Sequence, residues 1–460
     1  MMAQKAWEFE RELRDSSVPI DRRKEPSRWI KSDEEFPHGD ELLRWHWNVK
    51  VPGSLAPDVF FNGMVQAWGN QGYDVSAAEE LLPEGRALEA DGQMADLRVV
   101  SARIMKALKE APKIADHPYH GYQYPLAWED VKAAMPAAAQ DKPGSGWKEG
   151  YAERIYQGWL GQLAGGSFGT AIEGYVGKQI AAVYGDVRGY LTAPETTNDD
   201  VVYELLFLDV YELMGKDTTS EAVADEWVRQ LPYGVSAEGV ALRNLNMGIF
   251  PPESGYYLNP YCDWIGAQMR EMICGMLAPG DPMEAARLAT IDAVISHSRN
   301  GLYGGIYSAV LTSLAFVMDD PREIALEAAR YIPVKSEYAD KLDFCFYVLK
   351  ESGQPDVAWP ILEKHFERYN WIHAYPNLAA DLLALWYGGG DFTESMALLA
   401  KAGYDVDCNG GLVGSVLGVL KDVPPAWSDP IGDVLETYIK GKERISIRQL
   451  ADRTILAARE

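Results

Sequence analysis

Two segments of the chain carry glycines spaced by about one helical turn. They are Gly158, Gly161, Gly165 and Gly169 in the first segment, and Gly410, Gly414 and Gly418 in the second. On a helix, each set lies on one face and removes the side chains there, so another backbone can approach closely. Because glycine costs roughly 1 kcal/mol relative to alanine in a helix interior, its repetition favours close helix packing, with a ligand near the backbone as the alternative. An antiparallel pair of these helices would bring Glu173 beside Asp405 and Asp407.

The rest of the chain from Tyr151 onward also has the pattern of helices, and no segment sustains the alternation of a strand. The predicted helices span 151–165, 200–214, 221–231, 261–277, 283–297, 303–317, 322–331, 338–351, 376–387, 392–402 and 409–420. The pairs Asp281-Pro282 and Asp320-Pro321 mark helix starts, since proline suits the first turn. With 460 residues, 47% of them apolar, the chain can build a large core. We therefore expect an all-α fold, a compact multi-helix bundle.

The N-terminal third differs from the remainder. It holds seven of the 14 tryptophans, and prolines break several of its segments. Its clearest helical stretches are 95–111 and 127–140, and the polar run "QDKPGSGWKEG" that follows reads as a linker or loop. We predict a mostly helical, Trp-rich extension or cap over residues 1–148 and a main domain over residues 149–460. The first part is either a separate domain or an extension packed on the main domain.

The composition excludes several classes of partner. The formal charge of −25 argues against nucleic acid and acidic membrane surfaces, because both attract clustered Lys and Arg. The four cysteines are scattered and form no CxxC pair, so neither a zinc ribbon nor a disulfide framework is indicated. The N-terminus lacks the apolar core of a signal peptide, and we read no stretch of the sequence as a membrane span. We expect a cytoplasmic protein with no membrane partner; the sequence carries no signal for a particular oligomeric state.

One acidic cluster, Asn198-Asp199-Asp200, stands immediately before an apolar helical run. Taken alone, the pattern is typical of helix capping. Asparagine at the N-cap, with acids in the first turn, satisfies free N–H groups and the helix dipole.

A second oxygen-rich helix start contains Asp405, Asp407 and Asn409, followed by Gly410. It fits the first part of a calcium-binding EF-hand loop, but the glutamate required at position 12 is replaced by Val416. The segment is therefore not an EF-hand. If the two acidic starts converge, their carboxylates repel unless a cation or a proton neutralises them. Oxygen ligands favour Mg²⁺, Mn²⁺ or Ca²⁺ over zinc.

Five motifs occur in a fixed order along residues 151–428. They are "GWLGQLAGGSFGTAIEG", "NDDV", "RNLNMGIFPP", "ISHSRNGLYGG" and "GYDVDCNGGLVGSVLGVLKDVPPAW". In this order they resemble the ADP-ribosylglycohydrolase family (dinitrogenase reductase-activating glycohydrolase-like), with its T-D-D-T and D-T-D-T-N motifs. The resemblance implies an all-α fold, a centre of two Mg²⁺ ions (or Mn²⁺, with Ca²⁺ as a further alternative), and hydrolysis of a glycosidic bond at the anomeric carbon of ADP-ribose. The expected partner is a small-molecule ribosyl or ADP-ribosyl substrate.

The resemblance also implies site residues. The catalytic candidates are Glu173, Asp200 and Asp405. The candidate metal ligands are Asn198, Asp199, Asp200, Asp405, Asp407 and Asn409. The candidate substrate contacts are Gly169, Asn244, Asn246, His297 and Cys408, although His297 could equally be a buried structural histidine.

Several positions depart from the family pattern. Asn198 and Val201 replace threonines of the first acidic motif, and Val406 and Cys408 replace threonines of the second. A thiol is a poor ligand for hard Mg²⁺, so these changes weaken the expectation for one metal position. The leading hypothesis is a metal-dependent hydrolase of an N- or O-glycosidic bond to ADP-ribose or a related ribosyl compound. The alternatives are a nucleoside or small-metabolite ribosyl glycosidase, and a catalytically inactive ADP-ribose-binding or structural protein.

Overall fold

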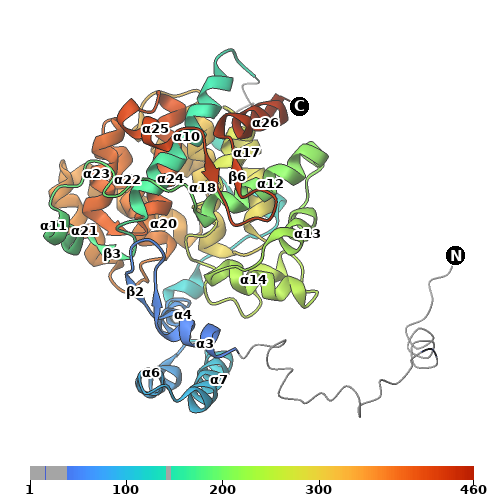
Figure 1. The fold of residues 1–460 in the computed structure, drawn as a ribbon, viewed down its shortest axis with the longest axis vertical. Coiled ribbons are helices and arrows are strands. Elements are labelled where there is room, and N and C mark those ends of the chain that lie inside the picture. The colour runs from blue at the N-terminus through green and yellow to red at the C-terminus, as the bar shows by residue number, and fades with distance from the viewer. Residues whose placement is uncertain (1–15, 17–38, 141–146, 460) are drawn as a thin grey trace, which may run out of the picture. The chain divides into compact units, whose positions relative to one another are not determined.

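The computed structural model describes residue 16 and residues 39–140 and 147–459. Residues 46–460 form one unit, and residues 1–45 belong to another. Within the described residues, helices predominate and every strand is two residues long, so the predicted all-α fold is confirmed (Figure 1).

The helices before the linker are α3 (Asp40–Trp47), α4 (Phe60–Asn70), α5 (Ser76–Glu79), α6 (Leu82–Ala90), α7 (Met94–Glu110), α8 (Trp128–Ala134) and α9 (Ala137–Gln140). Those that follow, up to the middle of the chain, are α10 (Tyr151–Gly169), α11 (Gly177–Tyr184), α12 (Asp199–Met214), α13 (Ser220–Gln230), α14 (Ser236–Asn246), α15 (Glu253–Tyr256), α16 (Met272–Leu277), α17 (Pro282–Ala293) and α18 (Arg299–Ala315). The remaining helices are α19 (Pro321–Ala328), α20 (Glu337–Ser352), α21 (Pro355–Phe366), α22 (Ala374–Tyr387), α23 (Phe392–Ala402), α24 (Val406–Leu420), α25 (Pro425–Ile431) and α26 (Ile447–Arg459).

The strands form three antiparallel pairs: β1 (Val49–Lys50) with β2 (Pro57–Asp58), β3 (Tyr175–Val176) with β4 (Gly403–Tyr404), and β5 (Leu435–Glu436) with β6 (Arg444–Ile445). Short 3₁₀ helices occur at Pro118–Gly121, Gly215–Asp217 and Ala329–Tyr331.

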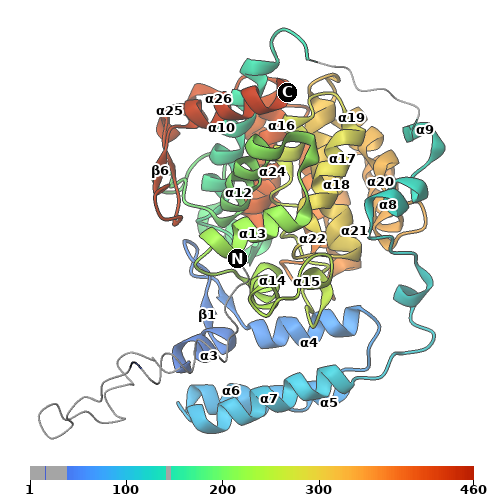
Figure 2. The same ribbon diagram turned by 90° about the vertical axis from the view of Figure 1, so that its right-hand side faces the viewer.

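Helices α10, α18 and α24 lie at the centre of the bundle. Helices α10 and α24 pack along each other, and α18 packs against α16, α17 and α24 (Figure 2). Every residue from Asn300 to Ala315 of α18 is buried. A helix that is buried on all sides carries no polar face, which explains why α18 shows no amphipathic pattern in the sequence.

Local sequence signals predict several helix starts correctly. Asp281 Oδ1 accepts a hydrogen bond from the Glu284 backbone N–H (3.1 Å) at the start of α17, and Asp320 caps α19 in the same manner. The predicted helix over 261–277 is wrong in its first part, because only Met272–Leu277 is helical. There the Ile265 backbone N–H donates to Ile372 O (2.9 Å), so this amide is bound to a distant segment instead of to its own turn.

The N-terminal helices match the expectation in outline. The predicted helix 95–111 is α7, which lies beside α6 (Figure 2). The predicted helix 127–140 forms as α8 and α9, because the chain breaks at Met135-Pro136. Trp47 is buried and stacks on Phe61 with ring centroids 4.7 Å apart. None of the helices in the described ranges is long and apolar enough to cross a bilayer, and the cytoplasmic location stays a prediction.

Candidate active site

The glycine faces of α10 and α24 pack against each other. Gly165 lies against the carbonyl of Gly410, and a methyl group at either position would overlap the other backbone. The pairing continues with Gly161 against Gly414 and Gly418 against the backbone of Gln157. The order of these contacts is antiparallel, which confirms the prediction from the glycine spacing. At the end of the pair, Gly169 lies against the backbone of Asp407, so this glycine is required by helix packing.

A short strand pair fixes the segment that follows α10. Tyr175 of β3 pairs with Tyr404 of β4, and the Gly174 backbone N–H donates to Tyr404 O (2.8 Å). Since Asp405 directly follows Tyr404, the strand pair holds Glu173 next to the start of α24. Strands of two residues leave no alternating pattern in a sequence, and for this reason the pair was not predicted.

Helix α12 begins at the same place. Asn198 Oδ1 accepts a hydrogen bond from the Asp200 backbone N–H (2.9 Å), so the capping expected from the sequence is present. The Asn198 side chain lies beside Gly166 of α10, and the buried Asp200 carboxylate lies beside Gly411 of α24. The first turn of α12 therefore meets both glycine-faced helices.

The three segments bring five carboxyl groups into mutual electrostatic contact: Glu173, Asp199, Asp200, Asp405 and Asp407. The pKa of each of the five groups is raised, and burial is the largest cause in every case. The pKa of Asp199 rises to about 6 through burial and the charge of Asp407. Burial and neighbouring carboxylates raise the pKa values of Glu173, Asp200 and Asp405 well above their usual range. In the absence of a cation, these raised pKa values favour the protonated form of the carboxyl groups.

The start of α24 presents a set of atoms suited to a metal ion. Asp405, Asp407 and Cys408 are buried, and each offers one ligand atom within 4.8 Å of the other two. The Oδ1 atoms of Asp405, Asp407 and Asn409 are buried and accept no hydrogen bond from the described residues. Buried acceptors normally have partners, and buried carboxylates normally pair or coordinate a metal. A divalent cation fits this donor set because it would satisfy both the charge and the free oxygens.

Asn377 of α22 supports the start of α24, a role that no sequence pattern indicated. Its Oδ1 accepts hydrogen bonds from the Asp405 backbone N–H (3.2 Å) and from Asn409 Nδ2 (2.9 Å). Its Nδ2 donates to the backbone of Trp371 and His373. Asn377 thus orients the amide of Asn409 and leaves Asn409 Oδ1 available.

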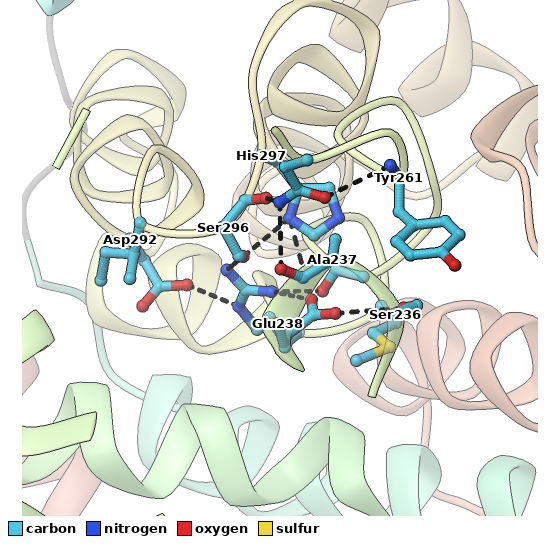
Figure 3. A network of polar contacts seen from close by, with 12 residues as sticks. Ser236, Ala237, Glu238, Tyr261, Asp292, Ser296 and His297 are labelled. Atoms are coloured by element: carbon cyan, nitrogen blue, oxygen red, sulfur yellow. Dashed lines mark hydrogen bonds and ion pairs between the residues drawn. The ribbon is translucent and has the colours of Figure 1, made fainter. Parts of the chain in front are cut away.

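His297 lies in a buried polar network (Figure 3). Its Nδ1 is 2.8 Å from Ser296 Oγ and 3.7 Å from Glu238 Oε1. Burial and the nearby Arg270 lower the pKa of His297 well below its usual value, so the ring is neutral at physiological pH. These contacts suit a structural histidine, which was the alternative raised by the sequence.

Arg270 organises this network and was missed from the sequence. Its guanidinium is fully buried and pairs with Glu238 (2.7 Å, α14) and Asp292 (2.6 Å, α17). The pKa of Glu238 is raised to about 7, chiefly by burial and to a smaller extent by the charge of Asp199, against the lowering effect of Arg270. Glu238 therefore couples the network electrostatically to the first turn of α12.

The two asparagines of the third motif bind backbone groups near their own helix. Asn244 Nδ2 donates to Ser254 O and Tyr257 O (both 2.9 Å), which fixes the turn after α14. Asn246 is exposed, and its Nδ2 donates to Leu242 O (2.8 Å). Their proposed substrate contacts remain predictions.

The turn between β1 and β2 reaches the segment that carries Glu173. Gly53 lies against Thr170, and a β-carbon on Gly53 would overlap the Thr170 side chain. Tyr175 Oη donates to Ser54 O (3.3 Å), and Gly174 lies against Ala56. The turn at residues 53–56 therefore packs next to the segment that carries Glu173.

The fold is all-helical, and two of its helices pack through glycine faces and gather five carboxyl groups. These features define the class of protein: a helical protein with a candidate divalent-metal centre. The sequence model of the ADP-ribosylglycohydrolase family matches residues 148–460, and the chain belongs to this family of glycosidase-type hydrolases. An uncharacterized protein from Archaeoglobus fulgidus is 24% identical over 288 residues, 60% of this chain and 90% of that protein. A solved ADP-ribosylglycohydrolase-related protein complex is 21% identical, with a TM-score of 0.47, and the match covers 68% of this chain and 99% of that chain.

Proposed function

We propose that the chain is a metal-dependent hydrolase that cleaves an N- or O-glycosidic bond at the anomeric carbon of ADP-ribose or a related ribosyl compound. The observation that carries the proposal is the meeting of Glu173 with four aspartates, two of which, Asp405 and Asp407, have a buried Oδ1 without a hydrogen-bond partner among the described residues. Buried like charges raise the free energy of the fold unless protons or a cation neutralise them, so such a cluster indicates a functional site. Membership of a glycohydrolase family supports the reaction class.

Six residues supply oxygen donors for the ions: Asn198, Asp199, Asp200, Asp405, Asp407 and Asn409. Oxygen donors of this kind suit two Mg²⁺ ions, with Mn²⁺ or Ca²⁺ as alternatives. When bound, a divalent ion supplies positive charge and Lewis acidity toward oxygen. The carboxylates are then held ionised, since the positive charge removes their mutual repulsion.

Glu173 is the candidate general acid or base. It is half-buried on the segment between α10 and β3, while Asp200 and Asp405 lie deeper. Burial and, to a smaller extent, the neighbouring aspartates raise its pKa in the ion-free protein, and a carboxyl group with a raised pKa suits proton transfer to a leaving group. Asp200 and Asp405, the other two catalytic candidates, fix the geometry of the site through the first turns of α12 and α24.

We propose a domain boundary at residues 148/149 on the basis of the family match, which starts at residue 148, within the unit of residues 46–460. The earlier part contributes the turn at 51–56, which packs on the segment containing Glu173. The turn at 51–56, next to the segment that carries Glu173, would restrict the size of the aglycone that the site can accept. This contact favours the second candidate, a nucleoside or small-metabolite ribosyl glycosidase, over an enzyme that acts on modified proteins.

The test is a hydrolysis screen with added Mg²⁺ or Mn²⁺ and mass detection of released ribosyl products. ADP-ribosyl-arginine, ADP-ribosyl-serine and a nucleoside panel separate the substrate classes. Product from one of these, lost in Asp199→Asn and Asp407→Asn, supports the proposal. ADP-ribose binding without any product would instead identify a catalytically inactive binding protein, and turnover unchanged in both variants would refute the metal-dependent mechanism.

A further inference from the structure

Two sulfur atoms lie at the carboxylate cluster. Cys408 Sγ is 3.7 Å from Met269 Sδ and 3.4 Å from Asp200 Oδ1. Both sulfur-bearing side chains are buried, with exposed fractions of 6%. Cys408 comes from the first turn of α24, and Met269 comes from the non-helical stretch before α16. Two distant segments thus place soft donor atoms beside hard oxygen donors.

The thiol of Cys408 belongs to the tightest donor set of the cluster. Its sulfur and one carboxylate oxygen each from Asp405 and Asp407 lie within 4.8 Å of one another. Asp405 Oδ1 and Asp407 Oδ1 are buried without a hydrogen-bond partner among the described residues. The sulfur therefore lies in one compact group with an oxygen of each carboxylate, and both residues also carry an unpartnered buried oxygen, so the site does not depend on the cysteine alone.

The chemistry of the donors decides which ion suits this position. Thiolate and thioether sulfur bind zinc and other thiophilic ions, whereas Mg²⁺ takes oxygen ligands. Zinc accepts mixed sets of thiolate and carboxylate ligands. At the corresponding position, the threonine of the family pattern would offer a hydroxyl oxygen and no such preference.

We propose that Cys408, together with Asp405 and Asp407, forms a mixed sulfur and oxygen site that selects a thiophilic divalent ion, Zn²⁺ in particular, over Mg²⁺. The inference rests on the metal centre of the proposed function but requires no turnover. On binding, the S–H bond of Cys408 breaks, a sulfur–metal bond forms, and the proton leaves to solvent, so no oxidant or reductant is involved. Met269 supplies a second soft atom next to the thiolate.

The test uses the metal-free full-length chain and Co²⁺ as a spectroscopic substitute for Zn²⁺. Titration with Co²⁺ is expected to produce thiolate-to-cobalt charge-transfer absorption in the near ultraviolet. Cys408→Ser and Cys408→Thr should abolish this absorption. Cys345→Ser is the matched control, because Cys345 is also buried and unbridged but lies on α20. Thermal unfolding of each variant confirms that it is folded, and Cys408→Thr, which carries the family's residue, serves if the serine variant does not fold.

Competition titration measures the selectivity. In the unmodified chain, Zn²⁺ should resist displacement by excess Mg²⁺, and Cys408→Thr should lower the preference for Zn²⁺ by about tenfold or more. Cobalt binding without charge-transfer absorption, or absorption retained in both Cys408 variants, would overturn this inference and leave the oxygen-based centre intact. If calorimetry detects no binding of Mg²⁺, Mn²⁺, Co²⁺ or Zn²⁺, the metal centre of the proposed function fails as well.

Discussion

Gly165 of α10 and Gly410 of α24 lie so close that a β-carbon on either would overlap the backbone of the other. This close contact fixes the register of α10 relative to α24, and the register in turn places Gly169 against Asp407. The carboxylate cluster therefore depends on two glycines that carry no functional group.

The first prediction concerns this helix contact. Gly165→Ala should lower the free energy of unfolding by roughly 1–3 kcal/mol, since overpacking forces the backbones apart. Gly189→Ala is the control, because a β-carbon there meets open space. Urea unfolding compares the two variants, and equal stability would contradict the packing explanation. Gly165→Ala should also weaken divalent-ion binding, which calorimetry measures.

The second prediction separates proton transfer from ion binding. Glu173→Gln should reduce turnover by about 10²- to 10⁴-fold, the usual contribution of a general acid or base. Asp405→Asn should reduce turnover and divalent-ion affinity together, because it removes a negative charge and one of the two side-chain oxygens from the donor set. Steady-state kinetics and calorimetry on both variants check this. If Glu173→Gln lost ion binding as completely as Asp405→Asn, Glu173 would be a ligand and not the acid.

The third prediction is a pH dependence of stability. The folded protein holds the Asp199 proton more tightly than the unfolded chain does, because burial raises its pKa from the usual 3.8 to about 6. The stabilisation from this group is present below about pH 4 and is lost as the pH rises through about 6. Without divalent ions, the free energy of unfolding should fall across this window. The stabilisation given by an added divalent ion should grow across it.

Denaturant unfolding with and without a chelator, at several pH values from about 4 to about 7, measures both trends. Asp199→Asn should flatten the pH dependence of the ion-free protein. A stabilisation by the ion that stays constant across this range would show that the carboxylates are already ionised.

The fourth prediction concerns the network around Arg270. Arg270→Met should destabilise the fold by about 3–5 kcal/mol, because Glu238 and Asp292 are left buried without a partner charge. Arg229→Met is the control. Arg229 is largely exposed and pairs with Glu226, so its loss should cost at most about 1 kcal/mol. If the free energy of unfolding fell by a similar small amount in both variants, the buried ion pairs of Arg270 would contribute little to stability.

Several features of the site were readable in the sequence because their signals are local. The glycine spacing gave the antiparallel pair of α10 and α24, and Asn198 gave both the cap and the start of α12. Asp281-Pro282 gave the start of α17. A helix face repeats every three to four residues, and a cap acts within one turn, so neither requires knowledge of the rest of the chain.

Other features had no local signal. Asn377 holds Asp405 and Asn409 from a helix about 30 residues away, and the pair of Tyr175 with Tyr404 spans more than 200 residues. The helix expected over 261–277 forms only from Met272, since tertiary hydrogen bonds bind the earlier backbone elsewhere. That same irregular stretch brings Met269 to Cys408 and buries Arg270.

The sequence by itself determined the helical class, the glycine faces of the two helices and the identity of the acids at their ends, because each is encoded in neighbouring residues. The tertiary structure alone decided that the buried His297 lies beside Ser296 and Glu238, and that a thioether stands beside the Cys408 thiol. Such pairings depend on which distant segments share the low-dielectric interior, where burial sets the charge of each group and the donor atoms that surround it.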